Sequence, residues 1–393
     1  MLGALAAALA LGSSPVASAQ DAPAPYRVAG IADVELFRGA EIGARARFEA
    51  LNAAGGIDGR LVEFLGVGDD HRDATMGLAE VRRLVDEVGV DAVVPVVTSR
   101  FTDGGTLAEA RVPAFGWGIA GGFCGNRWAF GITGCRAAVL PREQPTIWGT
   151  LVAQVVREGG ERRPTAVVVT EASAVPGSLV QITELVRDAG FRVTYAHAVL
   201  ESGESATAGV DATADAILAA GAKAPSAVFS VAGYSAVTAL QDALKARGYG
   251  GVMTNLVQYS PALVASAAGA FVLTDFATPE SAPENPRMQT ILDQVAAVTS
   301  DPVTPSTLAG WFAADFWIRA MERAGPGASP AKVARTASKM RFRIPRTIGP
   351  TAFPEAFVRP SSCGQLVTSD GTTFSVAATY RCSGYVRLQN TEN

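Results

Sequence analysis

Residues 48–60 read Phe-Glu-Ala-Leu-Asn-Ala-Ala-Gly-Gly-Ile-Asp-Gly-Arg, and Leu-Val-Glu-Phe follows at 61–64. The first part has a helical pattern, because Ala44, Phe48 and Leu51 recur at spacings of four and three and would share one face. The Gly-Gly pair then provides a helix C-cap, and the Asp-Gly pair provides a tight turn into an apolar run. The stretch predicts a helix that stops, turns and continues as a strand, which is the repeating unit of an α/β protein.

The same alternation of apolar runs and amphipathic helices extends along most of the chain. It begins at Arg27–Ile31, includes the apolar run 91–97, and restarts at 165–169. A Pro-rich stretch at 279–286 is followed by two helical segments, at about 288–298 and 306–324, which we interpret as a return to the first unit. We predict two Rossmann-like α/β lobes with parallel sheets, joined by a multi-strand hinge. The predicted lobes are 26–138 with 277–340 and 139–276 with 341–393, the second ending in a small β extension around the Asp370-Gly371 turn.

Composition narrows the class of protein. The 393 residues are 48% hydrophobic and 18% charged, which is typical of a packed globular chain of about two domains. The net charge is -4 and no polybasic run occurs, so we expect no nucleic-acid partner.

The N-terminal segment predicts export. Met1–Leu11 is an apolar run, and Ala17-Ser18-Ala19 before Gln20 has the small-residue pattern of a signal peptidase site. We therefore predict a signal peptide at 1–19 and a periplasmic or secreted, soluble mature chain. A basic n-region is missing, because no Lys or Arg precedes Arg27, so a translation start further upstream is an alternative. The apolar run is shorter than the roughly 20 residues that a membrane span needs.

The four cysteines fit an oxidising compartment. Cys124 and Cys135 flank a Gly-rich loop, and Cys363 and Cys382 flank a hairpin-like segment, so two local disulfides are the economical choice among three pairings. A zinc site is the alternative, but the chain has no CxxC pair and its two histidines, His71 and His197, lie far from the cysteines in sequence. We expect neither a metal nor a cofactor.

Short motifs that suggest catalysis lack their companions. Residues 116–121 match GxGxxG, but no amphipathic helix follows as a dinucleotide site requires. Gly233-Tyr234-Ser235 begins like a nucleophile elbow without its closing glycine, and Ser329 to Lys332 spells SxxK without SDN or KTG. We predict that the chain is not an enzyme, and a hydrolase using Ser235 is the weaker alternative.

The stretch 48–64 with the acidic pair Asp69-Asp70 resembles the opening of the type I periplasmic binding proteins of the leucine/isoleucine/valine-binding family. Residues 84–99 and 306–325 are similar to two further segments of that family. The resemblance implies a monomeric substrate-binding component of an ABC importer, which holds a small amino acid or related carboxylate between two closing lobes and delivers it to a membrane permease. A ligand-sensing module of the same fold is the alternative.

The candidate ligand-binding residues are those at predicted carboxyl ends of strands, where open α/β sheets bind ligands. They are Phe37, Arg38, Thr98, Ser99, Arg100, Trp117, Gly118, Ile119, Glu171, Ser173, Tyr234, Gln258 and Tyr259.

The resemblance gives these candidates separate roles. It implies that Thr98, Ser99 and Ile119 hold a ligand carboxylate, and that an acid of the second lobe holds an ammonium group. Gln258 stands where the family often has that acid, which leaves Glu171 or Asp275 as substitutes.

Other arrangements of the candidates fit the same positions. Arg38 and Arg100 could instead pair with an acidic ligand, while the aromatic residues could wall an apolar one. Arg100 pointing to solvent and Trp117 packing against Phe123 and Trp128 remain open alternatives.

Overall fold

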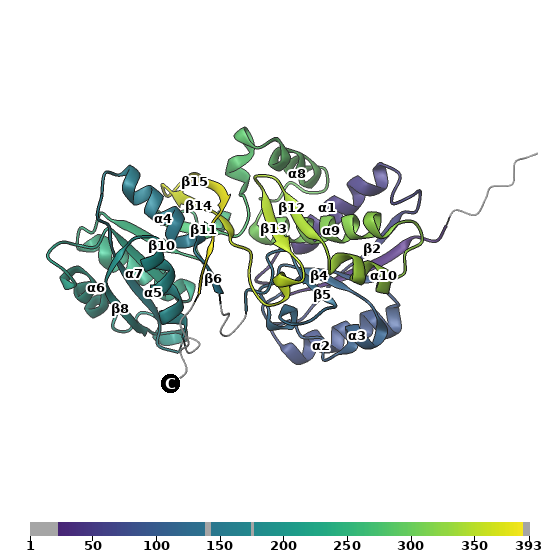
Figure 1. The fold of residues 1–393 in the computed structure, drawn as a ribbon, viewed down its shortest axis with the longest axis horizontal. Helices are drawn as coiled ribbons and strands as arrows, with labels where there is room; N and C mark the ends of the chain where they lie inside the picture. Colours follow the sequence, from purple (N-terminus) through teal and green to yellow (C-terminus); the bar gives the residue numbers. More distant parts are fainter. Residues whose placement is uncertain (1–22, 138–142, 174–176, 388–393) are drawn as a thin grey trace, which may run out of the picture.

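The computed structural model describes residues 23–137, 143–173 and 177–387, which form two α/β lobes side by side (Figure 1). The predicted signal peptide lies outside the described residues. The first lobe contains a five-stranded sheet in the order β2-β1-β3-β4-β5, with every pair parallel. Its strands are β1 (Tyr26–Ala32), β2 (Val62–Asp69), β3 (Ala92–Val97), β4 (Ala114–Gly116) and β5 (Ala129–Gly131). The central strand β3 is buried along its whole length, as its continuous apolar sequence predicts.

The helices of the first lobe come from two separate parts of the chain. The N-terminal part gives α1 (Ala40–Ala53), α2 (Ala74–Arg82), which continues as a π-helix over Arg83–Val88, and α3 (Thr106–Ala110). The later part gives α8 (Pro286–Ala296), α9 (Pro305–Ala324) and α10 (Pro330–Ala337). The predicted return of the chain to the first lobe is thus present: α9 packs against α1, β3 and β4.

Helix α9 forms much of the first core. Its start is fixed by a capping box, in which the Thr304 hydroxyl accepts the Thr307 backbone N–H and the Thr307 side chain accepts the Thr304 N–H. Along the helix, Phe312, Phe316 and Trp317 are almost fully buried. These aromatic rings join α9 to the sheet and to α1, so the returning segment stabilises the lobe that the N-terminal segment begins.

The second lobe has a mixed seven-stranded sheet in the order β15-β14-β11-β10-β9-β7-β8. Strands β8, β7, β9, β10 and β11 pair in parallel, and β14 and β15 add an antiparallel hairpin. The strands are β7 (Thr165–Glu171), β8 (Arg192–Leu200), β9 (Ala227–Val231), β10 (Val252–Asn255), β11 (Ala270–Thr274), β14 (Cys363–Ser369) and β15 (Phe374–Cys382). The helices are α4 (Ile147–Glu158), α5 (Ser178–Asp188), α6 (Val210–Ala219) and α7 (Tyr234–Ala246).

The predicted hairpin turn joins β14 to β15. The Asp370 carboxylate accepts the backbone N–H groups of Thr372 and Thr373 at 2.7 and 2.8 Å, which lowers its pKa to about 2. Both predicted disulfides are present, Cys124–Cys135 in the first lobe and Cys363–Cys382 across β14 and β15. Short strand β16 (Tyr385–Arg387) pairs with β6 (Glu143–Pro145) beside the junction of the lobes.

One predicted boundary is wrong. We assigned everything after residue 340 to the second lobe, but β12 (Arg341–Ile344) and β13 (Ile348–Ala352) pack on the first. Phe342, Ile348 and Phe353 are buried in the same core as α9, and the chain joins the second sheet only at β14. The other predicted boundary, at 138, falls among residues that are not described.

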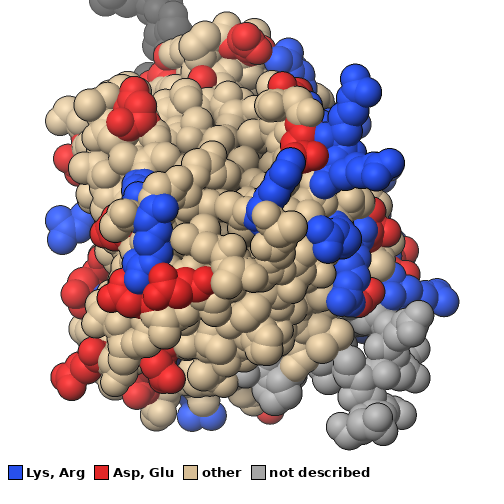
Figure 2. All heavy atoms as spheres, turned by 90° about the vertical axis from the view of Figure 1, so that its left-hand side faces the viewer, with Lys and Arg blue, Asp and Glu red and all other residues tan. Residues whose placement is uncertain are grey.

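The outer end of the second lobe carries scattered charge. Figure 2 shows acidic and basic side chains lying close to one another around a broad uncharged area. In this lobe, Arg247 pairs with Asp211 and Asp215 at 2.9 and 2.6 Å. In the described ranges, no helix is long and apolar enough to cross a membrane.

Candidate functional site

Free hydrogen-bond donors gather where β3 and β4 end. The two strands are neighbours, and the Trp117 backbone N–H donates to the Val96 carbonyl at 3.0 Å, which brings loops 98–100 and 117–119 together. Within the described part of the chain, the backbone N–H groups of Ser99, Gly118 and Ile119 donate to no acceptor. The Ser99 hydroxyl is also unpartnered there, and the residue is exposed. Unpartnered donors on neighbouring loops suit an anionic oxygen.

A glycine fixes the second of these loops. Gly118 has φ +96°, and a Cβ on it would lie 2.1 Å from the Gly134 carbonyl oxygen. The Gly118 carbonyl accepts the Arg136 backbone N–H at 3.0 Å, so the loop is tied to the segment after β5. Only glycine fits both the backbone conformation and this approach.

The Thr98 hydroxyl has two partners within the protein. It donates to the Asp70 carboxylate and accepts the Arg100 backbone N–H at 3.0 Å, and both Thr98 and Asp70 are buried. Thr98 therefore shapes the loop on which Ser99 and Arg100 are exposed. The Arg100 guanidinium is exposed and has no ion pair or hydrogen bond among the described residues.

Three aromatic rings lie beside this edge of the sheet. Phe37 packs edge-on against Trp117 with ring centroids 5.9 Å apart, and Trp117 lies 5.5 Å from Phe276. The Trp117 indole N–H donates to the Asp275 carboxylate at 3.3 Å. Trp117 therefore belongs to an apolar wall formed with Phe37 and Phe276, next to the unpartnered donors.

The second-lobe candidates fall into two groups. Glu171 ends β7 and accepts the Gly233 backbone N–H at 2.6 Å, while the Tyr234 hydroxyl donates to Ser266 at 2.7 Å. Ser173 is exposed, with its hydroxyl 3.5 Å from that of Ser202. These three residues lie at or after strand ends, but none has a hydrogen bond or ion pair with the first lobe among the described residues.

Gln258 and Tyr259, the remaining second-lobe candidates, are buried and have internal partners. Gln258 is fully buried, accepting from the Asn255 amide at 2.6 Å and donating to Thr238 at 3.2 Å. The Tyr259 hydroxyl donates to Glu280 at 2.8 Å, and burial raises its pKa well above the usual value. Both side chains are occupied by internal contacts, so they hold the loop after β10 in place.

A hollow lies between the two lobes, next to the loop that follows β10. It has a volume of about 290 Å³ and is lined by Arg38, Gly39 and Ile42 of the first lobe and by residues 260–262 of the second. The backbone carbonyl of Arg38 accepts the Ser306 and Thr304 hydroxyls at 2.6 and 3.1 Å. The Arg38 guanidinium has no partner in the described ranges. Among the predicted site residues, Arg38 alone is in the described lining of this hollow.

The sequence prediction missed a contact at the junction of the lobes. Asp275 follows β11, and its carboxylate pairs with the Arg136 guanidinium and accepts the Trp117 N–H. The pKa of nearby Tyr380 is raised, mainly because the side chain is buried and also because the Asp275 charge lies close to it. The position of Asp275 after a strand was a usable signal, whereas nothing in sequence pointed to Arg136.

No cluster of three potential metal-binding side chains occurs in the described part of the chain.

Comparison with known proteins identifies the architecture. The sequence model of the periplasmic binding proteins matches residues 26–373, which is most of the chain. The chain belongs to this periplasmic binding protein family. It has the type I fold, and as a family member it is a solute-binding protein rather than an enzyme. A search of curated protein sequences finds no match.

Solved structures show the same fold as this binding protein at low identity. A putative branched-chain amino acid ABC transporter protein from Rhodospirillum rubrum has a TM-score of 0.65 and 18% identity over 90% of this chain and 99% of its own. The binding protein LivJ from Streptococcus pneumoniae, in complex with isoleucine, has a TM-score of 0.64 and 15% identity over 90% and 99%. A solute-binding protein from R. palustris, in complex with benzoate, has a TM-score of 0.63 and 14% identity over 91% and 98%.

Proposed function

We propose that this binding protein is the extracytoplasmic component of an ABC importer, and that it holds a small carboxylate between its lobes for delivery to a membrane permease. The observation that carries the proposal is the group of donors on Ser99, Gly118 and Ile119, at the ends of adjacent strands, that have no acceptor among the described residues. Hydrogen bonds from such fixed donors to a carboxylate are charge-assisted and therefore strong. The family match and the structural likeness to ABC transporter proteins support the transport role.

Charges near the site favour an acid without an ammonium group. An ammonium needs an acidic partner, but Asp275 already pairs with Arg136 and one oxygen of Glu171 already accepts the Gly233 N–H, which leaves the second Glu171 oxygen and Asp301 of the hollow to meet it. Gln258 is neutral and buried. By contrast, the guanidinium groups of Arg38 and Arg100 form no ion pair or hydrogen bond with the described residues, although the Arg100 charge contributes to lowering the pKa of Asp73 after its backbone hydrogen bonds. A ligand of negative charge and with an apolar body fits both these cations and the aromatic wall.

Matched ligand pairs test the proposal. Thermal unfolding of the chain from Gln20 onward is measured with leucine against 4-methylpentanoate, and with phenylalanine against 3-phenylpropanoate. Each pair shares its skeleton and differs in the ammonium group. Ligand at 100 times its Kd stabilises the folded state by about 2.7 kcal/mol, so binding gives a clear rise in Tm. We expect the rise with the acids that lack the amine. A rise only with the amino acids would reverse the ligand class, and no saturable rise with any of the four would remove the carboxylate proposal.

Ser99 is tested by removing its hydroxyl. With the acid that gives the strongest shift, Ser99→Ala is expected to weaken binding by about 1 to 3 kcal/mol, because a hydrogen bond to a charged group is lost. Calorimetric titration measures the change, and the unfolding free energy should stay near that of the natural chain because Ser99 is exposed and unpartnered. Ser338→Ala at the C-cap of α10 is a control for loss of a serine hydroxyl outside the candidate loops, where that hydroxyl donates to the Arg335 carbonyl at 3.0 Å. Equal affinities in the two variants would exclude Ser99 from the site.

A further inference from the structure

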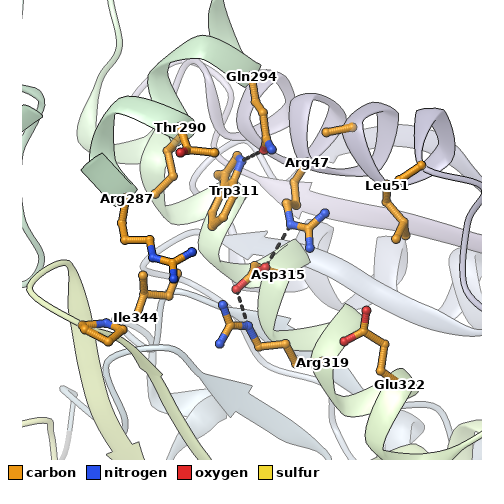
Figure 3. Close-up of a pocket in the computed structure, with 14 residues that line it drawn as sticks. Arg47, Leu51, Arg287, Thr290, Gln294, Trp311, Asp315, Arg319, Glu322 and Ile344 are labelled. Atoms are coloured by element: carbon orange, nitrogen blue, oxygen red, sulfur yellow. Dashed lines mark hydrogen bonds and ion pairs between the residues drawn. The ribbon is translucent and has the colours of Figure 1, made fainter. Parts of the chain in front are cut away.

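A second hollow lies on the first lobe among elements that take no part in the proposed site. It has a volume of about 520 Å³ and is bounded by α1, α8, α9 and the turn between β12 and β13 (Figure 3). A volume of this size is in the range that small-molecule sites occupy. Its wall does not include the donors at Ser99, Gly118 and Ile119.

Three arginines from three different helices surround this hollow. Arg47 comes from α1, Arg287 from α8 and Arg319 from α9, and Figure 3 shows their guanidinium groups around Asp315. Asp315 is 2% exposed, and it pairs with Arg47 at 2.9 Å and with Arg319 at 2.7 Å. Two cations therefore share a single buried carboxylate.

Arg287 leaves the cluster with unbalanced positive charge. Its guanidinium has no ion pair or hydrogen bond to any described residue. Glu322 also lines the hollow, so three cations face two acids. Arg47 binds Asp315 through Nε, and Arg319 uses Nε for Asp315 and Nη1 for the Arg343 carbonyl at 3.2 Å. Terminal N–H groups on all three arginines thus remain available for an oxyanion, which guanidinium groups bind in forked geometry.

The rest of the wall is apolar and held in place. The Trp311 indole N–H donates to Gln294 at 2.9 Å, and the Arg47 guanidinium lies 5.5 Å from the centre of the Trp311 ring. Leu51, Ile291 and Ile344 complete the apolar lining. The hollow therefore joins a cationic group to an apolar surface, a combination that suits a negatively charged head on a hydrocarbon or aromatic body.

We propose that this hollow is a second ligand site, which takes a small organic anion with a carboxylate or similar oxyanion head. The anion head would lie against Arg287 and the free N–H groups of Arg319, and its apolar body against Ile291 and Ile344. This site is independent of the one proposed at the junction of the lobes, because the two share no residue.

The test uses benzoate, whose head and body match the two halves of the hollow, and benzamide, which has the same body without charge. Both are titrated calorimetrically into the natural chain, Ser99→Ala, Arg287→Ala and Arg323→Ala. Arg323 lies on α9 outside the lining and serves as a control of equal charge change. Arg287 is the informative position because, among the described residues, its removal breaks no ion pair or hydrogen bond.

We expect a saturable benzoate event that Arg287→Ala weakens about tenfold and that Arg323→Ala leaves unchanged, separate from any benzoate binding at the interlobe site, which Ser99→Ala would weaken. An unchanged titration in Arg287→Ala, equal binding of benzamide, or no saturable event up to about 10 mM benzoate would overturn the proposal. Loss of benzoate binding only in Ser99→Ala would overturn it while leaving the interlobe site standing. An Arg287-dependent event would support it whatever the interlobe site binds.

Asp315→Asn provides a second test with the opposite sign. It removes the anion that Arg47 and Arg319 now share, so the hollow becomes more positive and benzoate should bind about tenfold more tightly. A purely structural role for Asp315 would not tighten binding. Weaker benzoate binding in an Asp315→Asn chain that unfolds cooperatively would contradict the proposed electrostatics.

Discussion

Gly118 shows how one residue sets the geometry of the proposed carboxylate site. Gly118→Ala must place a Cβ 2.1 Å from the Gly134 carbonyl at a φ of +96°, so the loop has to move. We expect a loss of about 1 to 3 kcal/mol in unfolding free energy and a larger relative loss of ligand affinity, because the N–H groups of 118 and 119 are displaced. Urea unfolding and calorimetric titration measure the two effects.

Gly121→Ala is the matched control in the same loop. A Cβ there meets no heavy atom within 4 Å, and its φ is not in the left-handed region. It should leave both quantities close to those of the natural chain. Similar behaviour of the two variants would show that general loop flexibility, and not the close approach at Gly118, governs the site.

The backbone positions of the candidate site follow from the sequence more directly than the side-chain contacts do. Ser99 and Ile119 follow apolar strands, and the position of a strand end is visible in sequence. The environments of Thr98, Gln258 and Tyr259 depend on Asp70, Thr238 and Glu280, which are 20 or more residues away in the chain. Such partners are set by tertiary packing. The sequence alone therefore does not show whether a polar side chain contacts a ligand or a partner within the protein.

Among the elements, the contact between α1 and α9 depends most on small residues. A Cβ on Gly310 of α9 would lie 2.0 Å from the Ala40 carbonyl oxygen of α1, which is backbone and cannot rotate away. Gly310→Ala should therefore separate the helices and lower the unfolding free energy by about 1 to 3 kcal/mol, even though alanine favours helices.

Equilibrium unfolding in urea measures this loss. Gly159→Ala, at the C-cap of α4, is the control because the nearest atoms to its Cβ would be 3.4 Å away. The control should change stability by no more than about 0.5 kcal/mol. A Gly310→Ala chain as stable as the control would mean that α1 and α9 can shift apart at no cost, contrary to the packing seen here.

At the scale of the molecule, the sequence predicted two lobes but put the last crossing of the chain into the second lobe too early, after residue 340 instead of at β14. The repeated strand–helix rhythm and the late helices 286–296 and 305–324 were enough for two α/β units and a return to the first. Alternating residues in β12 and β13 indicate that one face is buried, but they do not say in which core. Phe342, Ile344 and Ile348 enter the core of α9, and this choice depends on the shape of a surface that only the folded first lobe provides.

The ion pair between Arg136 of the first lobe and Asp275, which follows β11 where the chain crosses between the lobes, gives a prediction for the whole molecule. The Asp275 side chain is 13% exposed and pairs with Arg136, so Arg136→Ala leaves a largely buried carboxylate without its cation. We expect a loss of about 1 to 3 kcal/mol in unfolding free energy. Asp275→Asn in the same chain removes the unpaired charge, so the double variant should be less destabilised than the sum of the two single variants. Urea unfolding of the three variants, with Arg335→Ala on α10 as a control, measures this coupling. Additive losses would mean that Arg136 and Asp275 act separately, and that the crossing is held by packing around Phe276 and not by charge.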